Sequence, residues 1–184
     1  IIGFEKIDNQ KKFYNFNSIT NIKPSFLTFL NNLIFRNKLP LQISLYLQEN
    51  IRKKITKKFK NKIYDEAVFH LVRTAGYNDC ISSNLKKFEM TDSISLAYTR
   101  ASKYKIIPSF IRCIYNFEKE RLYKFEKLII RNFDTVYLIS KFDKKFILKK
   151  NTYDLNIEVT SNNSKEMITK NLYDVNSANL LFIG

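Results

Sequence analysis

The chain has 184 residues, of which 45% are hydrophobic and only 3 are Gly and 3 Pro, and this composition excludes wholesale disorder and long low-complexity linkers. The formal net charge of +15 is compatible with a nucleic acid or an anionic membrane as partner, and equally with the codon bias of an AT-rich genome. No stretch approaches 18 consecutive apolar residues, so no membrane-spanning helix is predicted.

The first third of the chain is predicted to contain the end of a strand, a polar loop, an amphipathic helix, a short apolar stretch of undetermined type and a basic helix. Apolar residues recur every four positions along the basic helix, which predicts that this stripe faces a core. The strand end is expected at residues 1–4, the loop at 8–21 and the amphipathic helix from Pro24 onward. The apolar stretch covers 39–47, and the basic helix covers about 48–60, with Ile51, Ile55 and Phe59 as its apolar stripe.

From residue 64 onward, strands are predicted to alternate with helices. Short apolar runs indicate four strands, and apolar residues at spacings of three or four, or multiples of them, indicate one long helix. Alternation of this kind is typical of a parallel sheet with helices on both faces, so we predict a Rossmann-like α/β fold. The strands are expected at 67–72, 86–90, 136–139 and 155–160, and the helix at 108–131, with an apolar face of Phe110, Ile114, Phe117, Phe125 and Leu128.

Polar residues follow three of these strands, at the points where each strand ends. In open α/β sheets, ligands bind outside the carboxyl ends of the strands, so these residues are the candidates for a binding site. Arg suits diphosphate or carboxylate groups because its guanidinium is planar and always charged. The candidates are His70 and Arg73 after the first strand, Asp92, Ser93 and Ser95 after the second, and Ser140, Lys141 and Asp143 after the third.

Two of the candidates have a structural interpretation that the sequence leaves open. His70 is the only histidine and lies between Phe69 and Leu71, so strand alternation could equally place it in the core. Arg73 could form an ion pair with Asp92 and have no ligand at all.

The serines and the long helix also have structural interpretations. Ser93, beside Asp92, is a possible N-cap for a helix over 94–100, and Ser140 with Asp143 fits a capping box. Three charged residues of the long helix are expected on a solvated face, and these are Glu118, Arg121 and Glu126.

Several catalytic motifs are absent from the sequence. It contains no Walker loop, no GxGxxG, no zinc-ligand spacing and no nucleophile elbow. The two cysteines, Cys80 and Cys113, are far apart and match no metal-ligand spacing or disulfide framework. No motif of a known RNA-binding module is present.

A set of short motifs occurs in a fixed order along the chain. They are HLVRTAGY at 70–77, MTDSISLAY at 90–98, a helix with Phe117-Glu118, Arg121 and Phe125-Glu126, then Phe133-Asp134 and ISKFD at 139–143. The set resembles the amino-terminal domain of group 1 (family 4) glycosyltransferases of the GT-B fold, and is most similar to the bacterial branch that assembles exopolysaccharides and surface glycans. LPLQISLY at 39–46 also fits this branch, and NLLFIG at 179–184 resembles the first strand of the second domain of such enzymes.

The resemblance implies two Rossmann-like domains with the active site between them. The nucleotide-sugar donor would be held mainly by the second domain, whose paired-glutamate motif is not in this chain, and no metal or other cofactor is expected. The amino-terminal domain would shape the acceptor pocket, with Asp92 as the expected catalytic residue, accepting a hydrogen bond from an acceptor hydroxyl, and with Arg73 steadying an anionic part of a substrate. The other substrate-binding residues expected there are His70, Ser93, Ser140 and Lys141.

The resemblance also implies a domain organisation and a location. Residues 1–160 would form the acceptor-side domain, residues 161–178 a linker, and residues 179–184 the start of the donor-binding domain. The family's first strand and glycine-rich loop would precede Ile1, and a Ser-Asn-Asn-Ser sequence at 161–164 replaces the usual Pro-Asn-Gly-type turn, so a fragment or a drifting gene is indicated. The expected location is the cytoplasm, with the anionic inner membrane as a surface where lipid-linked acceptors lie and where the basic helix at 48–60 would dock.

Two other functions fit the same sequence. One is a basic nucleic-acid-binding protein, although nucleic acid is not a partner in the leading interpretation. The other is an inactive α/β domain that only binds a partner.

Overall fold

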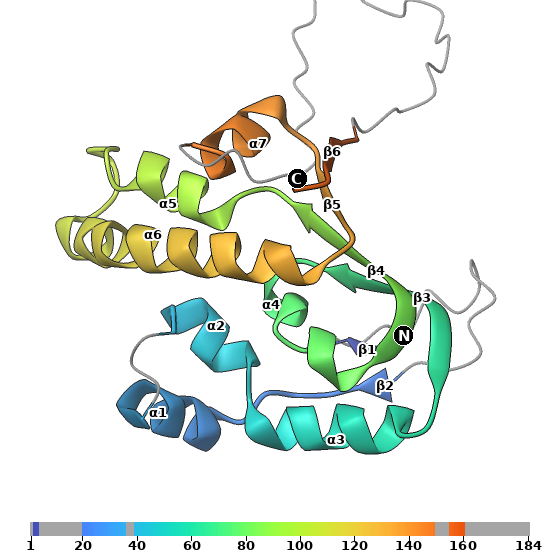
Figure 1. Ribbon diagram of the computed structural model, residues 1–184. Helices are drawn as coiled ribbons and strands as arrows, with labels where there is room; N and C mark the ends of the chain where they lie inside the picture. The colour runs from blue at the N-terminus through green and yellow to red at the C-terminus, as the bar shows by residue number, and fades with distance from the viewer. Residues whose placement is uncertain (1, 4–19, 36–38, 150–154, 161–184) are drawn as a thin grey trace, which may run out of the picture.

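The computed structural model describes residues 2–3, 20–35, 39–149 and 155–160, and its centre is a four-stranded parallel sheet (Figure 1). The strand order is β3-β4-β5-β6, so strands that follow one another in the chain are neighbours in the sheet. A separate two-stranded parallel ladder joins β1 (Ile2–Gly3) to β2 (Thr20–Asn21). The strands of the main sheet are β3 (Ile63–His70), β4 (Ser82–Thr91), β5 (Thr135–Leu138) and β6 (Ile157–Val159).

Helices connect these strands, so the predicted Rossmann-like α/β fold is confirmed. The short apolar stretch of undetermined type is a helix, and the predicted linker at 161–178 and strand at 179–184 lie outside the described residues. No helix of the described ranges is both long enough and apolar enough to cross a bilayer. The helices are α1 (Phe26–Phe35), α2 (Leu41–Tyr46), α3 (Glu49–Phe59), α4 (Val72–Ala75), α5 (Ile94–Ala101), α6 (Ser109–Ile129) and α7 (Lys141–Ile147), and 3₁₀ turns occupy Asn78–Cys80 and Ile130–Asn132.

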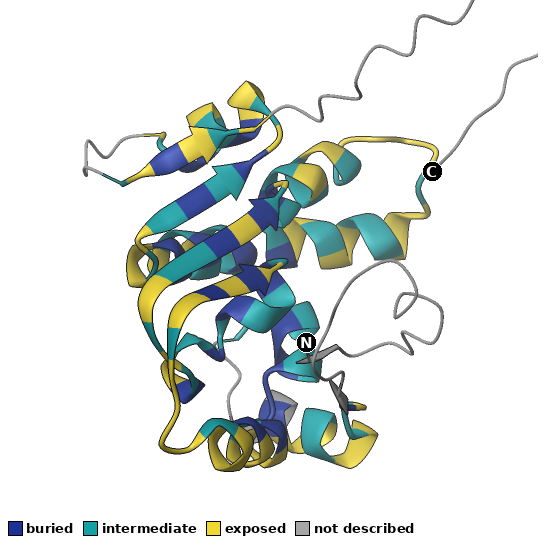
Figure 2. Cartoon of the chain, turned by 90° about the vertical axis from the view of Figure 1, so that its right-hand side faces the viewer, coloured by how far each residue is buried: buried dark blue, intermediate teal, exposed yellow. Residues whose placement is uncertain are grey.

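The two faces of the sheet differ in burial, and Figure 2 shows the change of colour along the strands. Side chains alternate between the faces because successive residues of a strand point in opposite directions. One row across the strands is buried and belongs to the core, whereas the row next to it is exposed or half-buried. The buried row is Phe69, Phe88, Val136 and Ile157, and the open row is His70, Glu89, Tyr137 and Glu158.

The basic helix α3 turns its apolar stripe inward, as predicted. Ile51 and Ile55 are buried in the core, and Phe59 packs against its edge. Arg52 also points inward, where it donates a hydrogen bond to the Gly76 carbonyl (2.9 Å) and pairs with Asp79. The exposed face of α3 therefore consists mainly of lysines.

The long helix α6 buries a different face from the predicted one. Two carboxylates and two apolar residues, at spacings of four, four and three, face the interior, and these are Glu118, Leu122, Glu126 and Ile129. The prediction of a solvated face for the two glutamates is therefore wrong, because each finds backbone or hydroxyl donors on a neighbouring helix. The predicted apolar face lies largely in solvent, with exposed side chains at Phe110, Ile114, Phe117 and Leu128.

Candidate functional site

The carboxyl ends of all four parallel strands lie along one edge of the sheet. A hollow of about 490 Å³ covers these ends. It is lined by side chains of the open face of the sheet and by the residues that directly follow β5 and β6. Its lining residues are His70, Glu89, Thr91, Tyr137, Leu138, Ile139 and Thr160. The hollow lies where the rule for open α/β sheets places a ligand.

The backbone at this edge is strained at two neighbouring strand ends. Leu71, directly after β3, has a φ of 65°, and Thr91, the last residue of β4, has a φ of 69°. A positive φ is unusual for any side chain and most unfavourable for a β-branched one, and it costs on the order of 1–3 kcal/mol. The ladder between β4 and β5 also shifts register between Glu89 and Thr91. Strain and bulges of this kind gather at binding sites, where they aim side chains that regular strands could not.

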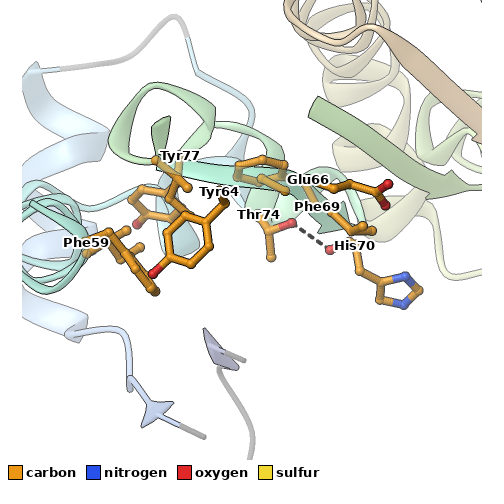
Figure 3. Close-up of a pocket in the computed structure, with 11 residues that line it drawn as sticks. Phe59, Tyr64, Glu66, Phe69, His70, Thr74 and Tyr77 are labelled. Atoms are coloured by element: carbon orange, nitrogen blue, oxygen red, sulfur yellow. Dashed lines mark hydrogen bonds between the residues drawn. The ribbon is translucent and has the colours of Figure 1, made fainter. Parts of the chain in front are cut away.

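His70 is at the carboxyl end of β3 and is exposed, so its interpretation as a core residue is wrong. Its Nδ1 lies 3.2 Å from Oε2 of Glu89, its neighbour in the register, and both side chains are more than half exposed. The imidazole points away from the β3 backbone into open space, while the hydroxyl of Thr74 donates to the carbonyl of His70 at 2.7 Å (Figure 3). The ring is therefore available to a ligand.

Arg73 lies in the short helix α4, one residue beyond the start of that helix. Its guanidinium stacks on the ring of Tyr46 at 5.0 Å and donates to the Tyr46 hydroxyl at 3.3 Å. No ion pair joins it to Asp92 in the described part of the chain, so the ion-pair interpretation is not supported. Arg73 does not line the hollow, and Tyr46 positions it beside α2.

Asp92 follows the strained Thr91 and is exposed. Partial burial of its carboxyl group raises the pKa of Asp92 above its ordinary value, and the nearby Asp143 carboxylate raises it further. Among the described hydrogen bonds its carboxylate accepts none from another residue, while its N–H donates to the carbonyl of Met90 (2.9 Å). A carboxyl group that is exposed, electrostatically disfavoured and placed at a strand end is a good acceptor for a ligand hydroxyl.

Ser93 is buried and structural, although the sequence also allows it as a substrate contact. Its hydroxyl caps α5 by accepting from the Leu96 N–H (3.2 Å) and donates to Glu126 (2.9 Å). Its own N–H donates to Asp143 at 2.8 Å. Every polar group of this side chain and its amide is thus used within the fold, which confirms the N-cap interpretation and leaves nothing for a substrate.

Ser140 and Lys141 begin α7. The Ser140 hydroxyl accepts from the Phe142 N–H at 3.1 Å, which confirms the predicted N-cap. Asp143 does not close the predicted capping box, because it turns to the amide of Ser93 instead. Lys141 is exposed, and neither it nor Ser140 lines the hollow.

A second hollow of about 520 Å³ runs along β3, the edge strand of the sheet (Figure 3). Its walls are mostly apolar and aromatic, from Ile55 and Phe59 of α3, Tyr64 and residues 66–70 of β3, and Tyr77. Tyr77 uses its hydroxyl inside the protein, accepting from the Gln48 N–H at 2.8 Å. His70 is shared by both hollows, but few other polar groups converge here, so we place the candidate site at the first hollow.

The structure thus brings His70 to the hollow and leaves Asp92 next to it, whereas Arg73, Ser140 and Lys141 lie outside. Four polar lining residues were missed by sequence reasoning, namely Glu89, Tyr137, Thr91 and Thr160. Register across parallel strands would have identified the first two, since they are the neighbours of His70 in one row.

No cluster of three or more His, Cys, Asp or Glu side chains in the described ranges is placed to bind a metal ion. The chain matches no protein-family model, no curated protein and no solved structure.

Proposed function

We propose that this chain is the acceptor-side domain of a nucleotide-sugar-dependent glycosyltransferase, and that the hollow at the carboxyl edge of the sheet receives the acceptor. The supporting observation is the convergence of four parallel strand ends on one hollow whose rim has a strained backbone and a carboxyl group of raised pKa. The class of reaction comes from the resemblance of the ordered motifs, and the geometry supports the place where a ligand would sit.

In this proposal an acceptor hydroxyl attacks the anomeric carbon of the donor sugar. The new glycosidic C–O bond forms as the bond from that carbon to the diphosphate breaks. The diphosphate leaves with the electron pair, and one of its oxygens takes the proton of the acceptor hydroxyl. Asp92 accepts a hydrogen bond from the acceptor hydroxyl and so orients its lone pair, which contributes by positioning. His70 and Glu89 line the hollow and are placed to hydrogen-bond other hydroxyls of the acceptor.

The test measures acceptor binding by the purified chain. The ligands are neutral oligosaccharides and glycosyl diphosphates, and heteronuclear NMR follows the backbone amides. We expect shifts at Thr91, Ile139 and their neighbours, and at least tenfold weaker binding for Asp92→Asn, in line with loss of a charge-assisted hydrogen bond.

Asp65→Asn is the matched control, because Asp65 is exposed on the same sheet but near the amino-terminal end of β3. It should bind like the parent chain. Shifts that map away from the strand ends, or no binding to any ligand of the panel, would contradict the proposal. Turnover of nucleotide sugars by this chain alone is not expected, since the resemblance places the donor site on another domain.

One observation favours nucleic-acid binding as a second candidate. The exposed face of α3 presents a cluster of lysines, and these are Lys53, Lys54, Lys57 and Lys58, with Lys60 just beyond the helix. Phosphate contacts by such a cluster would give binding that falls steeply with salt. Electrophoretic mobility shifts with oligonucleotides at increasing salt distinguish the two functions, because acceptor binding in the hollow should change little.

A further inference from the structure

The turn between α5 and α6, together with the first half of α6, exposes large apolar side chains. We call this surface the α5–α6 tip and define it as residues 100–117. Ile106 is 97% exposed, and Phe110, Ile114 and Phe117 follow on one face of α6 at i, i+4 and i+7. Tyr104, 60% exposed, is the fifth large apolar side chain of this surface. Contiguous apolar surface of this kind marks an interaction site.

The charges of the tip have a single sign. Its four charged residues are Arg100, Lys103, Lys105 and Arg112, and the sequence from 93 to 117 contains no Asp or Glu. Three of these cations are exposed, while Arg112 is half-buried and donates to the Ser109 hydroxyl (3.2 Å). Exposed apolar and aromatic groups flanked by cations match the surface of an anionic bilayer, which has an apolar interior beneath negative headgroups.

The position of the tip suits docking on a flat surface. α5 and α6 run side by side, and the turn that joins them lies at their far end from the sheet (Figure 1). Contact with a bilayer there would not cover the strand ends. The tip and the candidate site are therefore separate surfaces, connected by α5, which begins directly after Asp92 and Ser93.

Helix α3, which the sequence suggests for membrane contact, lacks half of these features. It has the lysines, but Ile51 and Ile55 are buried at 0% and 4% exposure. Cations without an exposed apolar partner give only screened, long-range attraction. The α5–α6 tip has both exposed cations and exposed apolar side chains, whereas α3 has exposed cations alone.

We propose that the α5–α6 tip is a membrane-docking surface that inserts Ile106, Phe110 and their apolar neighbours among the headgroups of an anionic bilayer. The inference goes beyond sugar transfer, because lipid binding requires neither donor nor acceptor. The cations of the tip lie beside the inserted side chains and contact the lipid phosphates.

Co-sedimentation with phosphatidylcholine vesicles, with and without phosphatidylglycerol, tests the proposal on the whole chain. We expect binding to the anionic vesicles and at least tenfold less for Ile106→Ser/Phe110→Ser, since two exposed side chains lose their apolar burial. Lys103→Gln/Lys105→Gln should weaken binding about fivefold for each lysine removed. The matched variant in α3, Lys53→Gln/Lys54→Gln, should change binding by less than about twofold.

Melting temperature and far-UV circular dichroism establish that each variant is folded, and the single variant Ile106→Ser serves if the double variant is not. Failure of the parent chain to bind anionic vesicles would overturn the proposal, as would an equal loss from the α3 variant. Sedimentation velocity tests whether a second copy of the chain binds the tip instead of a bilayer. A dimer that Ile106→Ser dissociates, without any vesicle binding, would show that the tip is an interface between two copies of the chain. None of these measurements depends on acceptor binding, so the two proposals can fail separately.

Discussion

Two buried glutamates on α6, two turns apart, do the same structural task in different surroundings. Glu118 accepts from the Leu41 N–H (2.6 Å), at the first residue of α2, and Glu126 accepts from the Ser95 N–H (3.0 Å), at the second residue of α5. Each carboxylate thus satisfies an amide that the helix itself leaves without a partner, at the end where the helix dipole favours negative charge. A single long helix in this way holds the amino-terminal ends of two others.

The difference between the two lies in how the charge is balanced. Glu118 forms an ion pair with Arg121, which also donates to the Leu39 carbonyl. Within the described ranges Glu126 pairs with no cation, and it accepts from amides and from the hydroxyls of Ser93 and Ser95. Burial raises the pKa of Glu126 to about 7, although these hydrogen bonds oppose the shift. Glu118, whose charge is balanced by Arg121, holds α2, and Glu126, whose charge is not balanced by a described cation, holds α5, which begins beside Asp92.

The largest expected effect on stability is at Glu118. Glu118→Ala removes the carboxylate that accepts from the Leu41 N–H and breaks the buried ion pair with Arg121, which we expect to destabilise the chain by about 3 kcal/mol. Urea unfolding measures the change. Glu120→Ala is the matched control, since Glu120 is exposed on the same helix and its loss should change stability by less than about 0.5 kcal/mol. Equal effects of the two variants would show that the Glu118 pair stabilises nothing.

The next effect is a dependence of the free energy of unfolding on pH, caused by Glu126. A carboxyl group with a raised pKa in the folded state binds its proton more tightly there than in the unfolded chain. Its contribution to stability is therefore fully present below the unfolded pKa of 4.5 and is lost as pH rises to about 7. A shift of this size corresponds to roughly 3 kcal/mol at the full 1.4 kcal/mol per pKa unit.

Glu126→Gln removes the titrating group and keeps its shape. The amide oxygen still accepts from the Ser95 N–H, so we expect the free energy of unfolding to become nearly flat between pH 4.5 and 7. Denaturant unfolding at a series of pH values compares the two chains. An unchanged slope in the variant would mean that another group causes the pH dependence.

A smaller difference separates two helix caps. Ser93 caps α5 and also donates to Glu126, whereas Ser140 only caps α7. We expect Ser93→Ala to cost about 2 kcal/mol and Ser140→Ala about 1 kcal/mol. Thermal unfolding of the two variants tests the order. The reverse order would indicate that Glu126 does not depend on the Ser93 hydroxyl.

The smallest effect on stability is expected at Asp92. Asp92 is exposed, and Ser93, not Asp92, caps α5. Asp92→Asn should therefore change the free energy of unfolding by less than about 0.5 kcal/mol. Acceptor binding should nevertheless fall at least tenfold, because the charged partner is lost. A melting temperature and a binding titration on the same sample separate the two. A variant that loses stability and keeps its binding would make Asp92 structural.

The sequence predicts the strands, the main helices and the caps of α5 and α7 because these depend on neighbouring residues. It does not identify the buried face of α6. Both faces of that helix have a regular spacing, and the face that is richer in apolar residues is the exposed one. Burial of Glu118 depends on Leu41, 77 residues away, and burial of Glu126 depends on Ser95, 31 residues away.

The candidate site, too, was only partly predictable from the sequence. The rule for parallel strands points to the edge of the sheet where the hollow lies, and it selects His70, which lines that hollow. Glu89 and Tyr137 become visible only with the register, since each lies on a different strand. Ser93 has the residue type of a substrate contact, but its amide and hydroxyl are already used by Asp143 and Glu126.

The positive φ angles of Leu71 and Thr91 have a consequence for laboratory evolution toward heat resistance. Glycine at either position would relieve on the order of 1–3 kcal/mol of strain, against about 0.5–1 kcal/mol for its greater freedom in the unfolded chain. Selection for thermostability alone should therefore favour Gly at one or both strand ends. Such variants would survive heating better, while the backbone at the two strand ends would become more flexible.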